Sequence, residues 1–305
     1  MQPSSFQYNF LAPSYWPTWL GLGLLRLICL LPIPWIIVLG EGLGALAGRL
    51  ARSRRDVVRV NLALCFPRLS TSERERLTNQ HFKSLGVGLF EAGLAWWASD
   101  ARLARRLTVE GLEHLDAALA RGGVLLLTGH FTTLELGARM AAMQRPFHPM
   151  YRPLNNALVD VLTSRWRSRR AGVPAIPKDD LRGLVRALRE GRAIWYAPDQ
   201  TLDRRHSVWA PFFGVPTQTI TATARLAAMG RCKVVPYFPE RDGSRYRLRF
   251  LPALENFPGA DEIADATRVN RLIEAGIGHA PAQYFWVHKR FKTRPPGEPD
   301  VYDRD

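Results

Sequence analysis

The stretch from Gly122 to Arg139, GGVLLLTGHFTTLELGAR, constrains the fold more than any other part of the chain. Val124 to Leu127 form a short apolar run bounded by glycines, which predicts a buried strand. Leu134 to Met143 carry apolar residues at helical spacing. His130 is therefore expected at a strand-to-helix turn, at the carboxyl end of a strand, where ligands usually bind in α/β sheets.

Around this unit, short apolar runs alternate with stretches of helical periodicity. The predicted strands are Val124–Leu127, Phe147–Tyr151, Ala193–Ala197, Val234–Phe238 and Tyr246–Leu251. The predicted helices are 56–66, 71–97, 133–143, 156–170, 179–190, 218–229 and 261–279. This alternation predicts an α/β fold: a mixed sheet flanked by helices, after an N-terminal hydrophobic membrane-anchor helix and a helical lead-in.

The N-terminal region is apolar enough to enter a membrane. Residues 19–39 are apolar except for Arg26, and 21 residues of helix would reach about 31 Å, the thickness of a bilayer core. Pro32 and Pro34 should kink or break that helix. We expect an anchor that either spans the bilayer or dips into one leaflet, and a core helix of a soluble protein is the alternative.

The charges around this segment predict its orientation. No Lys or Arg precedes residue 19, and four arginines follow the segment: Arg49, Arg52, Arg54 and Arg55. The positive-inside rule then places the bulk of the chain in the cytoplasm, with these arginines against anionic lipid. We expect residues 1–45 to form the membrane anchor and 46–305 to form a single α/β domain.

The chain is strongly basic, and its basic residues are nearly all arginine. The net charge is +15, and 37 of the 42 basic residues are arginine, whose planar fork suits phosphate and carboxylate groups. A GC-rich genome would also enrich arginine. The partner is expected to be anionic, either nucleic acid or a membrane surface, and the apolar N-terminus favours the membrane. Arg165, Arg169 and Arg170 end one predicted helix, either as a solvated face or as a cradle for a phosphorylated headgroup.

Several polar residues follow predicted strands at the same edge of the sheet. Glu135 comes five residues after His130, close enough for its carboxylate to fold back onto the imidazole and leave the other ring nitrogen as a base. A His and a Glu at this spacing also occur together by chance. Arg152 could contact an anion or carbonyl group, whereas Asp199 and Gln200 either hold a backbone turn or orient Arg152 and the substrate.

Other kinds of site are not supported by the sequence. The three cysteines, Cys29, Cys65 and Cys232, are far apart, so we expect no disulfide framework and no metal site. No phosphate-binding loop, dinucleotide fingerprint or Gly-x-Ser-x-Gly elbow occurs, so we expect no cofactor and no covalent serine catalysis. Residues 211–216, PFFGVP, form an apolar loop that is either a membrane or acyl-chain contact or internal packing.

Taken in order, these motifs resemble one family over nearly the whole chain. They are the apolar anchor, Asn61-Leu-x-Leu-Cys-Phe-Pro67, the block Gly129–Arg139, Tyr151-Arg-Pro, Tyr196-Ala-Pro-Asp-Gln200, Pro211-Phe-Phe-Gly and Trp286-x-His-Lys-Arg-Phe-Lys-Thr-Arg294. The chain resembles the late acyltransferases of lipid A biosynthesis, most closely their lauroyl-transferring branch. This group is similar to the wider glycerolipid acyltransferases, whose signature of His, four residues, then Asp or Glu matches His130 and Glu135.

The resemblance implies transfer of a fatty acyl chain, laurate in this branch, from acyl carrier protein to a hydroxyl on the 3-hydroxyacyl chains of Kdo-modified lipid IVA. It implies a place on the cytoplasmic face of the bacterial inner membrane. His130 would be the general base, steadied by Glu135, with direct attack and no acyl-enzyme. Arg152, Asp199 and Gln200, with Arg165, Arg169 and Arg170, would bind substrate. Acyl length and the chain that is acylated stay open.

Two other functions compete with this interpretation. A phospholipid-forming acyltransferase acting on glycerol phosphate or a lysophospholipid would also use a His–acid pair, but that group usually has Asp and a glycine-arginine block that is missing here. A non-enzymatic, basic, membrane-associated protein would bind nucleic acid or anionic lipid through its arginines. The chain contains no nucleic-acid-binding motif, so we expect no nucleic-acid partner.

Overall fold

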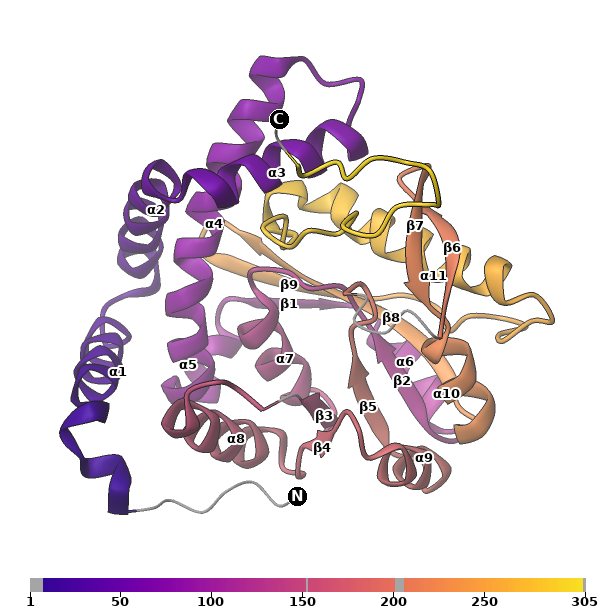
Figure 1. The fold of residues 1–305 in the computed structure, drawn as a ribbon. Helices are drawn as coiled ribbons and strands as arrows, with labels where there is room; N and C mark the ends of the chain where they lie inside the picture. Colours follow the sequence, from indigo (N-terminus) through magenta and orange to yellow (C-terminus); the bar gives the residue numbers. More distant parts are fainter. Residues whose placement is uncertain (1–7, 152, 201–205, 304–305) are drawn as a thin grey trace.

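A seven-stranded sheet forms the centre of the protein, which we describe from a computed structural model over residues 8–151, 153–200 and 206–303 (Figure 1). The strand order is β1-β9-β8-β2-β5-β3-β4, and the paired strands are parallel except for β8 and β9. The strands are β1 (Leu107–Glu110), β2 (Val124–Leu127), β3 (His148–Tyr151), β4 (Ile176–Pro177), β5 (Ala193–Tyr196), β8 (Lys233–Asp242) and β9 (Arg245–Phe250). The prediction of a mixed α/β sheet flanked by helices is confirmed.

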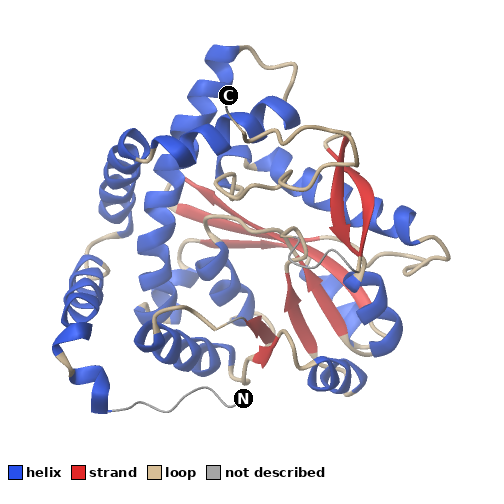
Figure 2. Cartoon of the chain, in the orientation of Figure 1, coloured by secondary structure: helices blue, strands red, loops and turns tan. Residues whose placement is uncertain are grey.

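Helices cover both faces of this sheet (Figure 2). They are α1 (Trp16–Ile28), α2 (Ile33–Leu50), α3 (Arg52–Cys65), α4 (Thr71–Trp97), α5 (Asp100–Ala104), α6 (Leu112–Leu119), α7 (Leu134–Ala142), α8 (Ala157–Ala171), α9 (Leu181–Arg189), α10 (Ala222–Gly230) and α11 (Glu262–His279). Short 3-10 turns occupy Tyr8–Leu11, Pro13–Tyr15 and Pro281–Gln283.

The central strand β2 divides the hydrophobic core in two. All four of its residues are buried, and alternate side chains point to opposite faces of the sheet. Leu125 and Leu127 pack in a cluster with residues of α9, α10 and α11. Val124 and Leu126 pack in a second cluster with residues of α4, α6 and α7. The continuous apolar run of β2 thus follows from burial on both faces, as expected for a strand in a parallel sheet.

A separate antiparallel hairpin was not expected from the sequence. It consists of β6 (Ser207–Phe212) and β7 (Val215–Ile220), so the end of β7 replaces the start of the helix predicted over 218–229. The PFFGVP segment comprises its turn, Phe213-Gly214, and the paired strand ends on either side. Phe212 is fully buried, and the ring of Phe213 lies 5.1 Å from that of Phe66, so the two phenylalanines are packing contacts within the protein.

The apolar N-terminal region forms two helices. α1 ends and α2 begins on either side of Pro32, so the predicted break is confirmed. Among the described helices, α2 alone is long and apolar enough to cross a membrane, and it runs through the boundary expected at residue 45. Both helices lie along one side of α4 (Figure 1). Large apolar side chains are exposed on these helices and in the turn between them: Leu20, Leu24, Leu27, Leu30, Trp35, Val38, Leu39, Leu43, Leu46 and Leu50.

Glycines let α2 approach α4 closely. The buried face of α2 includes Gly40, Gly44 and Gly48, one turn apart. A Cβ atom at Gly44 would overlap the carbonyl oxygen of Phe82, and one at Gly86 of α4 would overlap the carbonyl oxygen of Gly40. The two backbones are therefore in direct contact, which a larger residue at these positions would prevent.

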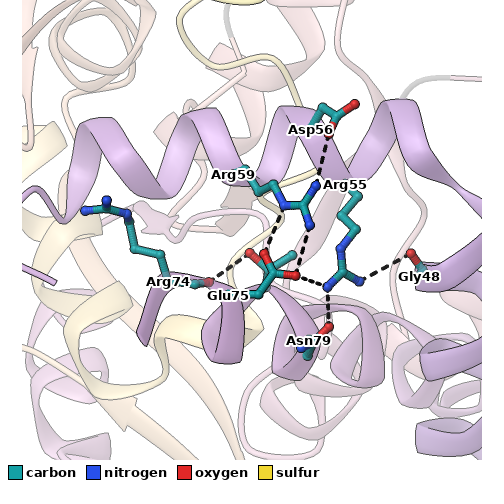
Figure 3. Close-up of polar contacts among 8 residues, drawn as sticks. Gly48, Arg55, Asp56, Arg59, Arg74, Glu75 and Asn79 are labelled. Carbon is teal, nitrogen blue, oxygen red and sulfur yellow. Dashed lines mark hydrogen bonds and ion pairs between the residues drawn. The ribbon is translucent and has the colours of Figure 1, made fainter. Parts of the chain in front are cut away.

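A cluster of ion pairs and hydrogen bonds connects α3 to α4 (Figure 3). Arg59 donates from Nε and Nη2 to the Glu75 carboxylate at 2.9 and 3.0 Å, and Arg55 also donates to Glu75. Arg55 reaches the Asn79 side-chain oxygen at 2.5 Å. The hydrogen bond from Arg59, assisted by Arg55, lowers the pKa of Glu75 to about 2 despite burial, which raises it. Arg55 is thus half-buried against α4, while the other three arginines after the apolar region, Arg49, Arg52 and Arg54, are exposed.

Replacing a contact glycine should separate the two helices. Gly44→Leu or Gly86→Leu should lower the free energy of unfolding by about 1–3 kcal/mol through overpacking. The matched control is Gly42→Leu on the same helix, because a Cβ atom there meets no atom within 4 Å. Thermal unfolding of detergent-purified protein measures the effect. Equal unfolding temperatures for the Gly42 and Gly44 variants would contradict the close contact.

Candidate active site

His130 lies just beyond the carboxyl end of β2, as the sequence predicted. The Thr128 amide donates to the Tyr196 carbonyl at 3.0 Å, so the pairing of β2 with β5 continues past both strands. The His130 backbone amide donates to Asp199 Oδ2 at 2.9 Å, and His130 Nδ1 lies 2.5 Å from Asp199 Oδ1. One carboxylate therefore fixes both the main chain and the ring of His130.

The register of the two strands explains this pairing. β2 and β5 are parallel neighbours, with Leu127 opposite Tyr196. His130 is three residues past Leu127, and Asp199 is three residues past Tyr196. The two side chains therefore leave adjacent strands at the same level. The sequence analysis placed both residues at strand ends but missed their contact, because strand order is not visible in the sequence.

Burial and charge determine which atom of the His130–Asp199 pair carries the proton. The Asp199 side chain is 1% exposed and that of His130 is 30% exposed. Burial raises the pKa of Asp199, but the charge and hydrogen bonds of His130, with a hydrogen bond from Tyr284, lower it to about 2. Burial lowers the pKa of His130, and the Asp199 carboxylate more than offsets this, so the pKa lies above its ordinary value. An ionised Asp199 keeps the proton on Nδ1 and leaves Nε2 to act as a base.

The contact expected between Glu135 and His130 is wrong. Glu135 Oε1 accepts from Trp96 Nε1 at 3.1 Å and from Arg167 Nε at 2.9 Å, and Oε2 accepts from Arg167 Nη2 at 2.5 Å. The first turn of α7 directs this side chain toward α4 and α8, where a guanidinium fork binds a carboxylate more strongly than a neutral imidazole would. Burial raises the pKa of Glu135, but Arg167 and Trp96 lower it overall, so the buried pair is ionic.

An apolar cavity of about 70 Å³ adjoins this ion pair. Leu134, Glu135, Trp166, Arg167 and Trp195 are among its lining residues. The Trp195 ring meets the His130 ring edge-on, with centroids 6.5 Å apart, and Trp195 Nε1 donates to the Tyr237 hydroxyl at 2.5 Å. Trp195 thus lies between the cavity and the His130–Asp199 pair.

The other predicted site residues are dispersed. Gln200 is half-buried next to Asp199, and Arg152 lies outside the described residues. Arg165 and Arg169 are exposed on α8. Arg170 donates to the Trp96 carbonyl at 3.3 Å and lies 3.7 Å from Asp100, so it contributes to packing of α8 against α4.

The arginine that the prediction missed is Arg167, which lies on the same helix and binds Glu135. Only the spatial arrangement distinguishes it from the neighbouring arginines on α8. In the described part of the chain, no group of three or more His, Cys, Asp or Glu side chains is placed to hold a metal ion.

The loop that carries His130 is held by a segment near the end of the chain. The Thr132 amide donates to the Gln283 carbonyl at 2.7 Å, and the Phe285 amide donates to the His130 carbonyl at 2.9 Å. Phe131 pairs with Tyr284 in an isolated antiparallel bridge. The conformation of the His130 loop therefore depends on residues more than 150 positions away in sequence.

Buried polar side chains support both segments. Asn61 of α3 donates to the carbonyls of Trp286 and His288 at 2.6 and 2.9 Å. On the other side of the loop, the hydroxyls of Ser84 and Thr132 lie 2.7 Å apart, and Arg241 donates to Ser84 at 2.6 Å. The sequence singled out the Asn61 and Trp286 motifs, and the structure gives them a supporting role.

Known proteins resemble this chain over nearly its whole length. A family model described as bacterial lipid A biosynthesis acyltransferase matches residues 4–293. The lipid A biosynthesis lauroyltransferase of Escherichia coli (strain K12) is 44% identical, over 97% of this chain and 98% of that protein. The lipid A biosynthesis palmitoleoyltransferase of the same organism is 41% identical, over 97% of this chain and 98% of that protein. Its lipid A biosynthesis myristoyltransferase is 30% identical, over 98% of this chain and 94% of that protein.

A search of solved structures found the 1-acyl-sn-glycerophosphate acyltransferase of Thermotoga maritima, with a TM-score of 0.39 and 13% identity, over 80% of this chain and 98% of that one. The sequence match to the family model extends over nearly the entire chain, and relatives well above 30% identity cover it from end to end. The chain therefore belongs to the bacterial lipid A biosynthesis acyltransferase family.

Proposed function

We propose that this protein transfers a fatty acyl chain, laurate in the first instance, from acyl carrier protein to a hydroxyl of a 3-hydroxyacyl chain on Kdo-modified lipid IVA. The observation that carries the proposal is the His130–Asp199 pair, a partly exposed base held by a buried carboxylate, in a chain of this family. We choose laurate because the 44% identical relative is a lauroyltransferase. Because a palmitoleoyltransferase is 41% identical, an assay must determine the acyl length.

The geometry supports direct attack without an acyl-enzyme. Nε2 of His130 takes the proton of the acceptor hydroxyl as its oxygen attacks the thioester carbon, and Asp199 stabilises the imidazolium that forms. The tetrahedral intermediate then expels the carrier thiolate, which takes the proton back from the imidazolium. α7 begins four residues after His130, so the positive end of its dipole favours the charge that develops on the thioester oxygen.

The N-terminal helices would keep the enzyme beside its lipid acceptor. Leu20, Leu24, Leu43 and Leu46 are each more than 40% exposed on them, and clustered exposed apolar side chains mark membrane or protein contact sites. Exposed Arg49, Arg52 and Arg54 at the junction of α2 and α3 suit anionic lipid headgroups. The enzyme would thus lie on the cytoplasmic face of the bacterial inner membrane, by spanning it or by insertion into one leaflet.

The proposed reaction predicts a specific product. Purified protein, incubated with a panel of C10 to C16 acyl carrier protein thioesters and Kdo-modified lipid IVA, should add one acyl chain, with the C12 thioester used most rapidly. Mass spectrometry of the lipid product measures this. Transfer to glycerol phosphate or a lysophospholipid, with none to Kdo-modified lipid IVA, would reject the proposal in favour of a phospholipid-forming enzyme.

Removal of the base should abolish transfer. His130→Ala should lose the contribution of a general base, on the order of 10²–10⁴-fold in kcat, with membrane association unchanged. Flotation with vesicles and thermal unfolding control for localisation and folding. Retention of more than a few per cent of the wild-type rate would rule out His130 as the base.

The pH profile should separate the two carboxylates. The base must be neutral, so kcat/KM should fall as the pH drops below the raised pKa of His130. Asp199→Asn removes the charge that raises this pKa, so the acid limb should shift to lower pH while kcat falls, on the order of 10²-fold or more. Glu135→Gln should leave the acid limb in place whatever it does to the rate, because Arg167 already balances that charge. A limb that moves with Glu135 and not with Asp199 would contradict the assignment.

A further inference from the structure

A second, much larger hollow lies beside the His130 loop. It is a groove of about 840 Å³ between α2, α4 and residues 285–292, a volume typical of ligand sites, which span roughly 300–1,000 Å³. We call it the α2–α4 groove. It shares no lining residue with the apolar cavity of about 70 Å³ beside Trp195. The residues that line the groove are Leu43, Gly44, Ala47, Ala51, Arg54, Phe82, Leu85, Gly86, Leu89, Phe285, Val287, His288, Lys289 and Lys292.

The groove combines an apolar floor with a basic rim. Leu43, Leu89 and Phe285 are 42%, 53% and 36% exposed, so the floor offers apolar surface to an occupant. Arg54, Lys289 and Lys292 are exposed around them, and the lining residues include no carboxylate. An occupant that satisfies both parts must itself be amphiphilic, with an apolar chain attached to an anionic group.

One wall of the groove is built on the catalytic loop. Phe285, in that wall, donates its backbone amide to the His130 carbonyl at 2.9 Å. On α4, Gly88 lies between the lining residues Leu85 and Leu89, and a Cβ atom there would meet the Thr132 carbonyl at 2.5 Å. The groove therefore adjoins the loop that carries His130.

The other side of the groove is continuous with the apolar surface of α2. Leu43, Ala47 and Ala51 line the groove, and Leu39, Leu46 and Leu50 of the same region are exposed outside it. A lipid chain could thus enter from a bilayer around α2 without crossing water, which favours a membrane lipid over a chain delivered by a soluble carrier.

We propose that the α2–α4 groove binds the acceptor lipid, with one acyl chain on the Leu43–Leu89–Phe285 floor and its phosphate or carboxylate groups on Arg54, Lys289 and Lys292. The proposal rests on the function proposed above and deepens it, since it assigns a place to the acceptor. The donor acyl chain is the competing occupant, and the test distinguishes the two.

Steady-state kinetics, with the donor and the acceptor concentrations varied separately, test which substrate the groove binds. Leu43→Trp should fill the floor, and Arg54→Ala with Lys292→Ala should remove two rim charges. Each change should raise the KM for Kdo-modified lipid IVA by at least about ten-fold and leave the KM for the acyl carrier protein thioester within about two-fold. The matched controls are Leu46→Trp, one turn away on α2 and outside the groove, and Lys233→Ala, exposed at the opposite end of the sheet.

Three results separate failure of the groove from failure of the function. If wild-type protein transfers acyl chains and the acceptor KM of the groove variants is unchanged, the groove assignment is wrong and the function stands. A rise in the donor KM alone would assign the groove to the donor chain and also overturn the proposal. If no transfer occurs, direct binding of Kdo-modified lipid IVA is measured to His130→Ala protein and to the same protein with Leu43→Trp added. Equal binding to the two proteins, or no binding to either, overturns the groove assignment.

Discussion

Asp199 carries a negative charge in a position that water hardly reaches, and the imidazole of His130 is what stabilises it there. A buried, unpaired carboxylate would take up a proton, whereas this one is held ionised by the ring and backbone amide of His130 and by the Tyr284 hydroxyl. The same contacts orient the ring and select its tautomer. The pairing in turn depends on the parallel register of β2 and β5, because a slip by one residue would turn one partner to the other face of the sheet.

The surrounding structure keeps this pair in place through buried polar contacts. Arg241 connects α4 to β8 through Glu91, at 2.9 Å, and through Ser84, whose hydroxyl contacts that of Thr132 in the His130 loop. Glu135 and Arg167 connect α7 to α8 beside the apolar cavity. Each of these charges is costly to bury alone, so each contact specifies one arrangement of helices around the site. Glu135 thus positions α8 relative to the His130 loop and lies apart from the His130–Asp199 pair.

Much of this arrangement was predictable from local sequence pattern. The strand Val124–Leu127 was predicted with the bounds it has, because glycines delimit an apolar run, and the prolines marked the break between α1 and α2. The β6–β7 hairpin was missed, since its pairing depends on packing against α11 and the C-terminal segment, as when Asn270 binds Thr219 at 2.9 Å. The partner of His130 was also missed. Glu135 is nearer in sequence, but strand order and helix direction decide which carboxylate meets the ring.

The central claim is that Asp199 holds the Nδ1 proton of His130 and raises its pKa. Nitrogen NMR of protein labelled at histidine, with the His130 signals assigned from their loss in His130→Gln, tests this directly. The account predicts a protonated Nδ1 and an unprotonated Nε2 at pH 8, a pKa above the ordinary value of 6.5, and a fall in that pKa on Asp199→Asn. A His130 that is protonated on Nε2 at that pH, or whose pKa does not respond to Asp199, would contradict it.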